Sequence, residues 1–232
     1  MNEIYGVLDR VAFIAGEDEE TRRSFASLGT CRSVPRGNIL FHDGDPCLAL
    51  YIVVNGKVKV VLAGEDGREL ALDVLGPGNV CGLVAAVDDG PHTGTAITQA
   101  ASRIAMIPRE RFRAWLGERP LLQGRILIQM AQLLRGAYAR VGSQSLLSVK
   151  DRVKAALLDM AREDGTLSAL EYLVLPRPTH QELAERVGST RVVVSRAIKA
   201  LLEEEDGIDM QGRVLRVRLT SVDPQESGTP LA

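Results

Sequence analysis

A run of residues near the C-terminal end of the chain combines arginines, a lysine and a serine at helical spacing, which is the chemistry of contact with nucleic acid. Val194, Ile198 and Leu201 repeat as one apolar stripe of a helix. A guanidinium group can bond guanine at two atoms, and lysine or serine can hold a phosphate. The sequence therefore predicts a rod that enters the DNA major groove. Its outer face carries Arg191, Val192, Ser195, Arg196 and Lys199.

A shorter helix should precede this rod. Thr179 and Glu182 form a capping box, in which the hydroxyl accepts a backbone N–H bond and the carboxylate reaches back to the cap. Gly188 can turn without steric penalty where this helix must end, and Ser189 can cap the next one. The pattern predicts a helix-turn-helix, and the alternative is a helical hairpin whose charged face is only solvated. The apolar side of the first helix is Leu183, Ala184 and Val187.

The residues after the helix pair have the pattern of a β-hairpin. Residues 207–210 and 213–219 are strand-like, and Gln211-Gly212 lies between them. The second strand alternates basic and apolar side chains. A basic ribbon directly after two such helices is typical of the wing of a winged helix-turn-helix, and it makes the solvated hairpin the weaker interpretation.

The chain resembles the Crp/Fnr family of bacterial transcription factors over nearly its whole length. The resemblance lies in Gln181-Glu182, in residues 187–191, in Ser195-Arg196 and in a glycine-punctuated N-terminal half. It implies a homodimer that reads two half-sites of double-stranded DNA. It also implies RNA polymerase as a partner if the protein is an activator.

The resemblance assigns roles within the helix pair. Arg191, Val192 and Arg196 would occupy the base-reading positions. Many members have a glutamate where this chain has Val192, and valine cannot accept a bond from cytosine but can pack on a thymine methyl group. We therefore expect a half-site that differs from that of the family prototype at this base pair. Phosphate contacts and the rest of the interface would come from His180, Gln181, Ser189, Thr190, Ser195 and Lys199.

Size and composition are those of a globular protein that can hold two domains, with 232 residues, 45% hydrophobic and 25% charged. The net charge of −2 averages over a local excess of arginine in residues 186–218. The three cysteines are widely spaced, the N-terminus has no basic signal segment, and no apolar run reaches membrane-spanning length. These features favour a cytoplasmic protein that does not enter a membrane.

Glycines interrupt residues 30–107 at close intervals, which is typical of many short strands. Strand-like runs lie at residues 49–54, 57–62 and 69–74. Asn55-Gly56 should form a two-residue hairpin turn between the first two runs, because this pair tolerates positive φ best. The pattern predicts an antiparallel sandwich or barrel, and the resemblance implies the cyclic-nucleotide-binding β-roll of the family.

By resemblance, the ligand segment of that roll is residues 81–94. Where the family has Gly-Glu this chain has Gly82-Leu83, and His92 or Thr93 stands near the expected arginine. The pair that reads the base from the long helix aligns with Ala137-Tyr138. The loss of two charged hydrogen bonds, at about 1.5 to 3 kcal/mol each, weakens binding by on the order of a hundredfold or more. We therefore expect no cyclic AMP binding in the mode of the prototype, and the effector stays unknown.

Other chemistry has less support in the sequence. Haem ligation by Cys81 or His92 is an open alternative, although a cysteine near a strand end is more often a packed hydrophobe. An iron–sulfur cluster normally needs four cysteines. His42, His92 and His180 have no metal-ligand or catalytic spacing, so we expect no metal site, no catalytic residue and no enzyme. The alternative function is a ligand-binding or protein-interaction module that does not read DNA.

Residues 120–141 have a helical period with two apolar stripes, which favours two partners. One stripe would pack on the roll, and the other would pair with the same helix of a second chain. Residues 142–145 weaken the pattern and are a candidate hinge, before a helix at 146–162 and a strand at 173–175. The stripes are Ile126, Met130, Leu133 and Ala137, and Leu127, Leu134 and Val141.

Together these features predict an α+β protein. Its parts are an N-terminal antiparallel β-roll of jelly-roll type, a long dimerisation helix and a C-terminal winged helix-turn-helix. The expected domains are a sensor at residues 1–117, the dimerisation helix at 118–142 and the DNA-binding domain at 143–222. Residues 223–232 are polar and interrupted by prolines, and they should form a disordered tail.

Overall fold

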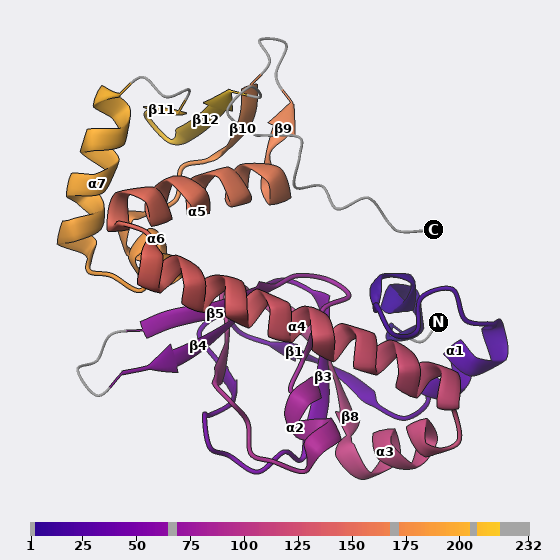
Figure 1. Ribbon diagram of the computed structural model, residues 1–232. Helices are drawn as coiled ribbons and strands as arrows, with labels where there is room; N and C mark the ends of the chain where they lie inside the picture. The colour runs from indigo at the N-terminus through magenta and orange to yellow at the C-terminus, as the bar shows by residue number, and fades with distance from the viewer. Residues whose placement is uncertain (1–2, 65–68, 168–171, 205–207, 219–232) are drawn as a thin grey trace. The chain divides into compact units, whose positions relative to one another are not determined.

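The computed structural model describes residues 3–64, 69–167, 172–204 and 208–218, and the expected tail at 223–232 lies outside them. The chain forms two compact units, Met1–Tyr138 and Ala139–Ala232. Figure 1 labels most helices and strands of both units, numbered in chain order. No helix in the described part of the chain is long and apolar enough to cross a membrane.

Two four-stranded antiparallel sheets form the roll of the first unit (Figure 1). One sheet has the strand order β1-β8-β3-β6, and the other has the order β2-β7-β4-β5. This arrangement confirms the predicted antiparallel fold. The strands are β1 Thr30–Val34, β2 Ile39–Phe41, β3 Ala49–Asn55, β4 Val58–Ala63, β5 Glu69–Leu75, β6 Val80–Cys81, β7 Thr95–Thr98 and β8 Ser102–Pro108.

Strand β3 is buried on both faces, which explains why its sequence does not alternate between apolar and polar residues. Leu50 and Ile52 belong to a core cluster shared with the helices of this unit. Tyr51 and Val53 belong to a second cluster shared with strands of the other sheet. A strand covered on both sides is a nearly continuous apolar run.

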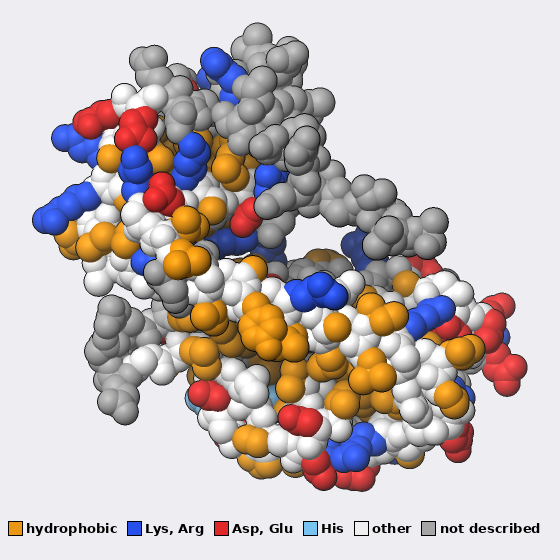
Figure 2. All heavy atoms as spheres, in the orientation of Figure 1, with side chains coloured by type: hydrophobic (Ala, Val, Ile, Leu, Met, Phe, Trp, Pro, Cys, Tyr) orange, Lys and Arg blue, Asp and Glu red, His pale blue; other side chains and the backbone are white. Residues whose placement is uncertain are grey.

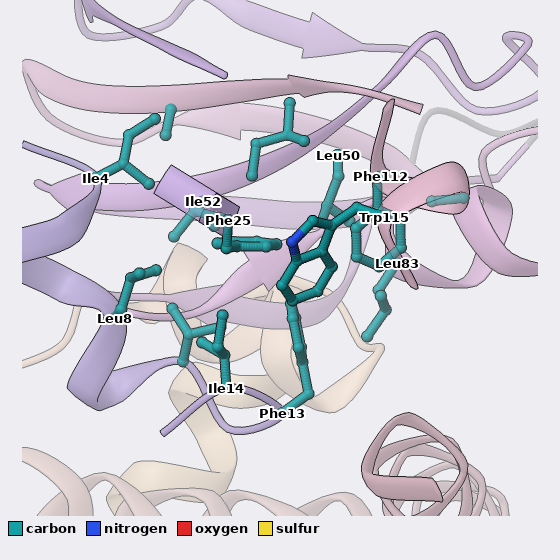
Figure 3. Close-up of a cluster of buried hydrophobic side chains, with 14 of the residues drawn as sticks. Ile4, Leu8, Phe13, Ile14, Phe25, Leu50, Ile52, Leu83, Phe112 and Trp115 are labelled. Carbon is teal, nitrogen blue, oxygen red and sulfur yellow. The ribbon is translucent and has the colours of Figure 1, made fainter. Parts of the chain in front are cut away.

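Helices supply aromatic rings to the first of these clusters (Figure 3). Phe25 lies edge to face with Phe13 and with Trp115, with ring centroids 5.6 and 5.0 Å apart, the geometry that aromatic pairs prefer. Trp115 is the only tryptophan of the chain, and its Nε1 donates to Ser24 Oγ at 2.8 Å. Phe25 lies on α1 Glu19–Ala26 and Trp115 on α3 Arg109–Gly117, whereas Phe13 lies between helices. The 3-10 helix η1 Tyr5–Arg10 and helix α2 Leu83–Asp88 add apolar residues to the same cluster.

The predicted hairpin at Asn55-Gly56 is wrong. β3 pairs with β6 and β8, whereas β4 pairs with β5 and β7, so the chain crosses from one sheet to the other here. Gly56 has a φ of +98°, and a Cβ at this position would lie 2.7 Å from Ser102 Cβ. Glycine is needed at this point because a neighbouring strand approaches closely and because φ is positive.

Helix α4 spans Pro120–Leu146 and is continuous through the predicted hinge at residues 142–145. A glycine inside a helix costs only about 1 kcal/mol, so Gly142 does not end this one. The helix ends before Ser148, whose Oγ accepts a bond from Asp151 N at 3.2 Å and caps the next helix. That helix, α5, spans Val149–Asp164, so it begins later than the expected position 146.

Helices and a small sheet share one core in the second unit. Val153, Leu183, Val194 and Leu215 come from four different elements and lie in one cluster. The sheet has the strand order β11-β12-β10-β9, which confirms the predicted winged helix-turn-helix. Its elements after α5 are β9 Thr166–Leu167, β10 Tyr172–Pro176, α6 His180–Val187, α7 Arg191–Glu203, β11 Ile208–Gln211 and β12 Val214–Arg218.

Candidate DNA-binding surface

Helix α6 begins with the predicted capping box. Thr179 Oγ1 accepts a bond from Glu182 N at 3.1 Å, and Glu182 Oε2 accepts one from Thr179 N at 2.7 Å. The two bonds satisfy backbone donors that a helix start leaves unpaired, so they fix where α6 begins. His180 is thereby held half-buried in the first turn, with Gln181 exposed beside it.

The turn between α6 and α7 differs from the prediction by one residue. Gly188 has the expected left-handed backbone, with a φ of +62°. The cap of α7 is Thr190 rather than Ser189, because Ser189 N donates back to Ala184 O at 2.9 Å and still belongs to the end of α6. Thr190 Oγ1 instead accepts a bond from Val193 N at 3.4 Å. Helix α7 therefore starts at Arg191.

Helix α7 has one buried side and one exposed side. Val194, Ala197, Ile198 and Leu201 are buried in the core of the second unit. The sequence-predicted contact residues lie on the other side, and Figure 2 shows Lys and Arg side chains on the surface over α7. Arg191, Val192, Arg196 and Lys199 are exposed, and Ser195 is half-buried.

The basic side chains on the exposed side of α7 differ in whether a carboxylate of the protein lies close to them. Lys199 Nζ lies 3.9 Å from a carboxylate oxygen of Glu203. Arg191 and Arg196 make no ion pair with any residue that the structure describes. Two guanidinium groups therefore stand in solvent with their hydrogen-bond donors free for an external acceptor.

The hairpin of β11 and β12 carries further basic groups that the sequence analysis did not include among the contact residues. The turn runs through Gly212, whose φ is +58°. Arg213 follows it and is exposed, and the backbone N–H of Arg177 donates to Arg213 O at 2.8 Å. Arg177 is also exposed, and it directly precedes the Pro178-Thr179 start of α6. For Arg177, the only sign in the sequence was its position just before the cap of α6.

The fold of the roll brings two of the expected effector residues together, since a Cβ added at Gly82 would lie 3.0 Å from His92 Cε1. Gly82 is half-buried with a φ of +80° before α2, and Leu83 is buried in the core cluster that contains Phe112 and Trp115 (Figure 3). His92 is 3% exposed, and its ring is stacked on that of Phe41 with centroids 3.6 Å apart. Thr93 is exposed, whereas Ala137 on α4 is half-buried and Tyr138 is exposed.

Burial dominates the acid–base properties of this region. It lowers the pKa of His92, which the charge of Asp45 raises to a lesser extent. It raises the pKa of the Cys81 thiol to about 12. Because a thiolate, not a thiol, is the metal ligand, this pKa disfavours haem ligation by Cys81. The described residues contain no group of three or more His, Cys, Asp and Glu side chains that could hold a metal ion.

Comparison with known proteins finds the same two modules. Residues 31–119 match the family "Cyclic nucleotide-binding domain", and residues 151–223 match the family "Crp-like helix-turn-helix domain". A CRP-like cAMP-activated global transcriptional regulator of Mycobacterium tuberculosis is 33% identical over 164 residues, 71% of this chain and 73% of that protein. The chain belongs to the Crp/Fnr family. As a Crp/Fnr regulator it is a transcription factor with a DNA-binding helix-turn-helix and a sensor module of the cyclic-nucleotide-binding type.

Two more relatives of this Crp/Fnr regulator extend the comparison. The cAMP-activated global transcriptional regulator CRP of Escherichia coli is 27% identical over 202 residues, 87% of this chain and 95% of that protein. The c-di-GMP responsive global regulator CLP of Xanthomonas campestris superposes with a TM-score of 0.74 at 25% identity, over 87% of this chain and 99% of that one. These likenesses favour the regulator over a module that does not read DNA.

Proposed function

We propose that this Crp/Fnr regulator binds DNA as a homodimer whose two α7 helices read the two half-sites of one operator. The observation that carries the proposal is that Arg191 and Arg196, on the exposed side of α7, make no ion pair with a described residue. Arginine bonds the O6 and N7 acceptors of guanine in the major groove. The phosphates on either side would be held by polar residues around α7 and at the start of α6. These are Ser189, Thr190, Ser195 and Lys199, with His180 and Gln181 on α6.

The exposed apolar face of α4 supports the homodimer. Figure 2 shows hydrophobic side chains gathered along α4. Leu127, Ile128, Leu134, Tyr138 and Val141 are between 51% and 69% exposed, whereas Ile126 is buried. A large apolar patch on a monomer marks an interface, and a helix can bury such a stripe against its own copy. The 27 residues of α4 make a rod of about 40 Å, which is long enough for a stable pairing.

DNA binding is tested by salt titration and by replacement of the two arginines. Affinity for a mixed pool of duplexes should fall steeply as salt rises, because bound phosphates release counterions. Arg191→Ala and Arg196→Ala should each weaken the specific complex by roughly tenfold to a hundredfold. Arg36→Ala, an exposed arginine between β1 and β2 of the sensor, is the matched control and should bind as the wild type does. Wild-type affinity in both α7 variants would contradict the proposal.

The sensor domain should not bind cyclic AMP in the manner of the prototype. Leu83 and Thr93 are uncharged, whereas the nucleotide-binding members have charged anchors in this segment. Leu83 is also buried in the core and cannot contact a ribose. Titration calorimetry of the full chain with cyclic AMP, cyclic GMP and c-di-GMP tests this. With cyclic AMP we expect no binding heat that corresponds to a micromolar dissociation constant. The arm with c-di-GMP is included because CLP of Xanthomonas campestris responds to it.

The remaining assignments follow from this function. We place the sensor at residues 1–117, the dimerisation helix at 118–142 and the DNA-binding domain at 143–222. The protein acts in the cytoplasm, where bacterial DNA lies, and RNA polymerase is its partner where it activates. It carries out no catalytic step. Capture of bound genomic DNA would identify the promoters and, through the genes they control, the class of signal.

A further inference from the structure

Val192 is an apolar side chain at the centre of an otherwise polar surface. Successive residues of an α-helix are turned by about 100°, so Val192 lies opposite the middle of the buried stripe of α7. Ser195 and Arg196 follow it one helical turn further on, and Val192 is 61% exposed. Packing within the domain therefore does not account for a valine at this position, and its methyl groups are available to a partner.

The chemistry of the groove limits what such a side chain can recognise. Valine neither donates nor accepts a hydrogen bond. The apolar group that a base pair shows in the major groove is the methyl group on C5 of thymine. Position 5 of cytosine lies at the same edge, and in 5-methylcytosine it carries the same methyl group. A reader that makes only an apolar contact responds to the methyl group and not to the hydrogen-bonding groups of the base.

We propose that Val192 reads the 5-methyl group of a pyrimidine, whether thymine or 5-methylcytosine carries it, so that cytosine-5 methylation of the operator at this base pair strengthens binding. This proposal rests on the proposed function, because it requires α7 to enter the major groove. It deepens that function by naming a chemical mark on DNA to which the regulator responds.

The expected size of the effect follows from burial of one methyl group. Such a group changes affinity by roughly fourfold in one half-site, and by roughly fifteenfold when both half-sites carry the change. Two matched comparisons isolate it. Thymine and uracil opposite adenine differ only in the methyl group, and so do 5-methylcytosine and cytosine opposite guanine. Both ratios should favour the methylated base at the same base pair.

The test measures binding of the full chain to an operator selected from random duplexes. Each thymine is replaced in turn by deoxyuridine, and the pyrimidine position found in this way is also built as cytosine and as 5-methylcytosine. Fluorescence anisotropy gives the affinities. We expect one base pair in each half-site at which loss of the methyl group weakens binding by about fourfold.

Variants then assign the effect to a side chain. Val192→Ser should abolish the ratio between methylated and unmethylated duplexes, whereas Val192→Thr should retain it because threonine keeps one γ-methyl group. Val193→Ala is the matched control, since Val193 is 38% exposed and is turned away by one helical step. It should retain the ratio. Thermal unfolding checks that each variant is folded.

The outcomes separate the two proposals. Tight binding with no methyl effect at any pyrimidine, or a methyl effect that survives Val192→Ser, overturns the reading by Val192 and leaves DNA binding intact. A chain that binds no duplex at low salt overturns the proposed function, and the reading by Val192 with it.

Discussion

At the scale of residues, two side chains of the segment 81–94 pack inside the roll, where we had expected a ligand site. Leu83 is buried with Phe112 and Trp115, and the His92 ring is stacked on Phe41. The backbone of His92 also pairs with the 42–46 turn, because His92 N donates to Asp45 O at 2.9 Å. Leu83 and His92, which we expected near the ligand anchors of the family, thus hold the roll together by packing.

Acid should loosen the sensor through His92. Burial lowers the pKa of His92, so between its folded pKa and the ordinary value near 6.5 the unfolded chain binds more protons. Stability should therefore be full above pH 6.5 and should fall as the pH drops below it. Urea unfolding followed by the fluorescence of Trp115 measures this.

His92→Gln removes the titrating ring, and the loss of stability between pH 7 and pH 5 should become smaller. His42→Gln is the control, because it makes the same replacement at an exposed histidine of the roll. An unchanged pH dependence in His92→Gln would show that other groups cause the loss.

Gly56 should be intolerant of a side chain. Alanine there would hold a φ of +98° and bring its Cβ to 2.7 Å from Ser102 Cβ, so Gly56→Ala should lower the free energy of unfolding by roughly 2 kcal/mol or more. Gly37 has a φ of +78° with no atom within 4 Å of the added Cβ. Gly37→Ala should therefore cost only about 1 kcal/mol, from backbone strain alone. Equal costs would indicate that the approach of Ser102 does not matter.

At the scale of elements, short-range hydrogen bonds determine where the helices of the DNA-binding domain begin. Thr179 and Glu182 start α6, Ser148 starts α5, and Thr190 starts α7. The long helix α4 shows the complementary case, because Gly142 does not interrupt it. In these helices, capping side chains therefore determine the boundaries more than a residue of low helix propensity does.

The capping box of α6 should contribute measurable stability. Thr179→Ala removes a bond of 3.1 Å and should lower the free energy of unfolding of the DNA-binding domain by about 1 kcal/mol. Thr190→Ala removes a longer bond of 3.4 Å at the start of α7 and should cost less. Urea unfolding followed by circular dichroism gives both values. A larger cost for Thr190→Ala would reverse the assignment of the stronger cap.

At the scale of the whole molecule, the proposed function needs two copies of the chain to match the symmetry of an operator. Twin recognition helices enter successive major grooves about 34 Å apart, and a monomer can fill only one of them. The exposed apolar face of α4 is the surface on which we base this pairing.

A charge on that face should dissociate the dimer. Leu134→Glu would bury a carboxylate in the paired helices, so sedimentation should show a monomer and operator affinity should fall by at least a hundredfold. Leu48→Glu is the control, because Leu48 is also exposed but lies between β2 and β3. It should remain a dimer. A Leu134→Glu protein that remains a dimer would move the interface away from this part of α4.

The sequence by itself determined the features that depend on neighbouring residues. The capping box, the glycine turn, the buried stripe of α7 and the basic hairpin are all local patterns, and the structure contains each of them. Tertiary structure decided which strands pair, and it made Asn55-Gly56 a crossing between sheets because β3 finds its partner in the distant β8. It also decided that Leu83 is buried, since only the folded roll brings Phe112 and Trp115 to the cluster that contains it. Pairing and burial depend on residues far apart in the chain, and no local pattern carries that information.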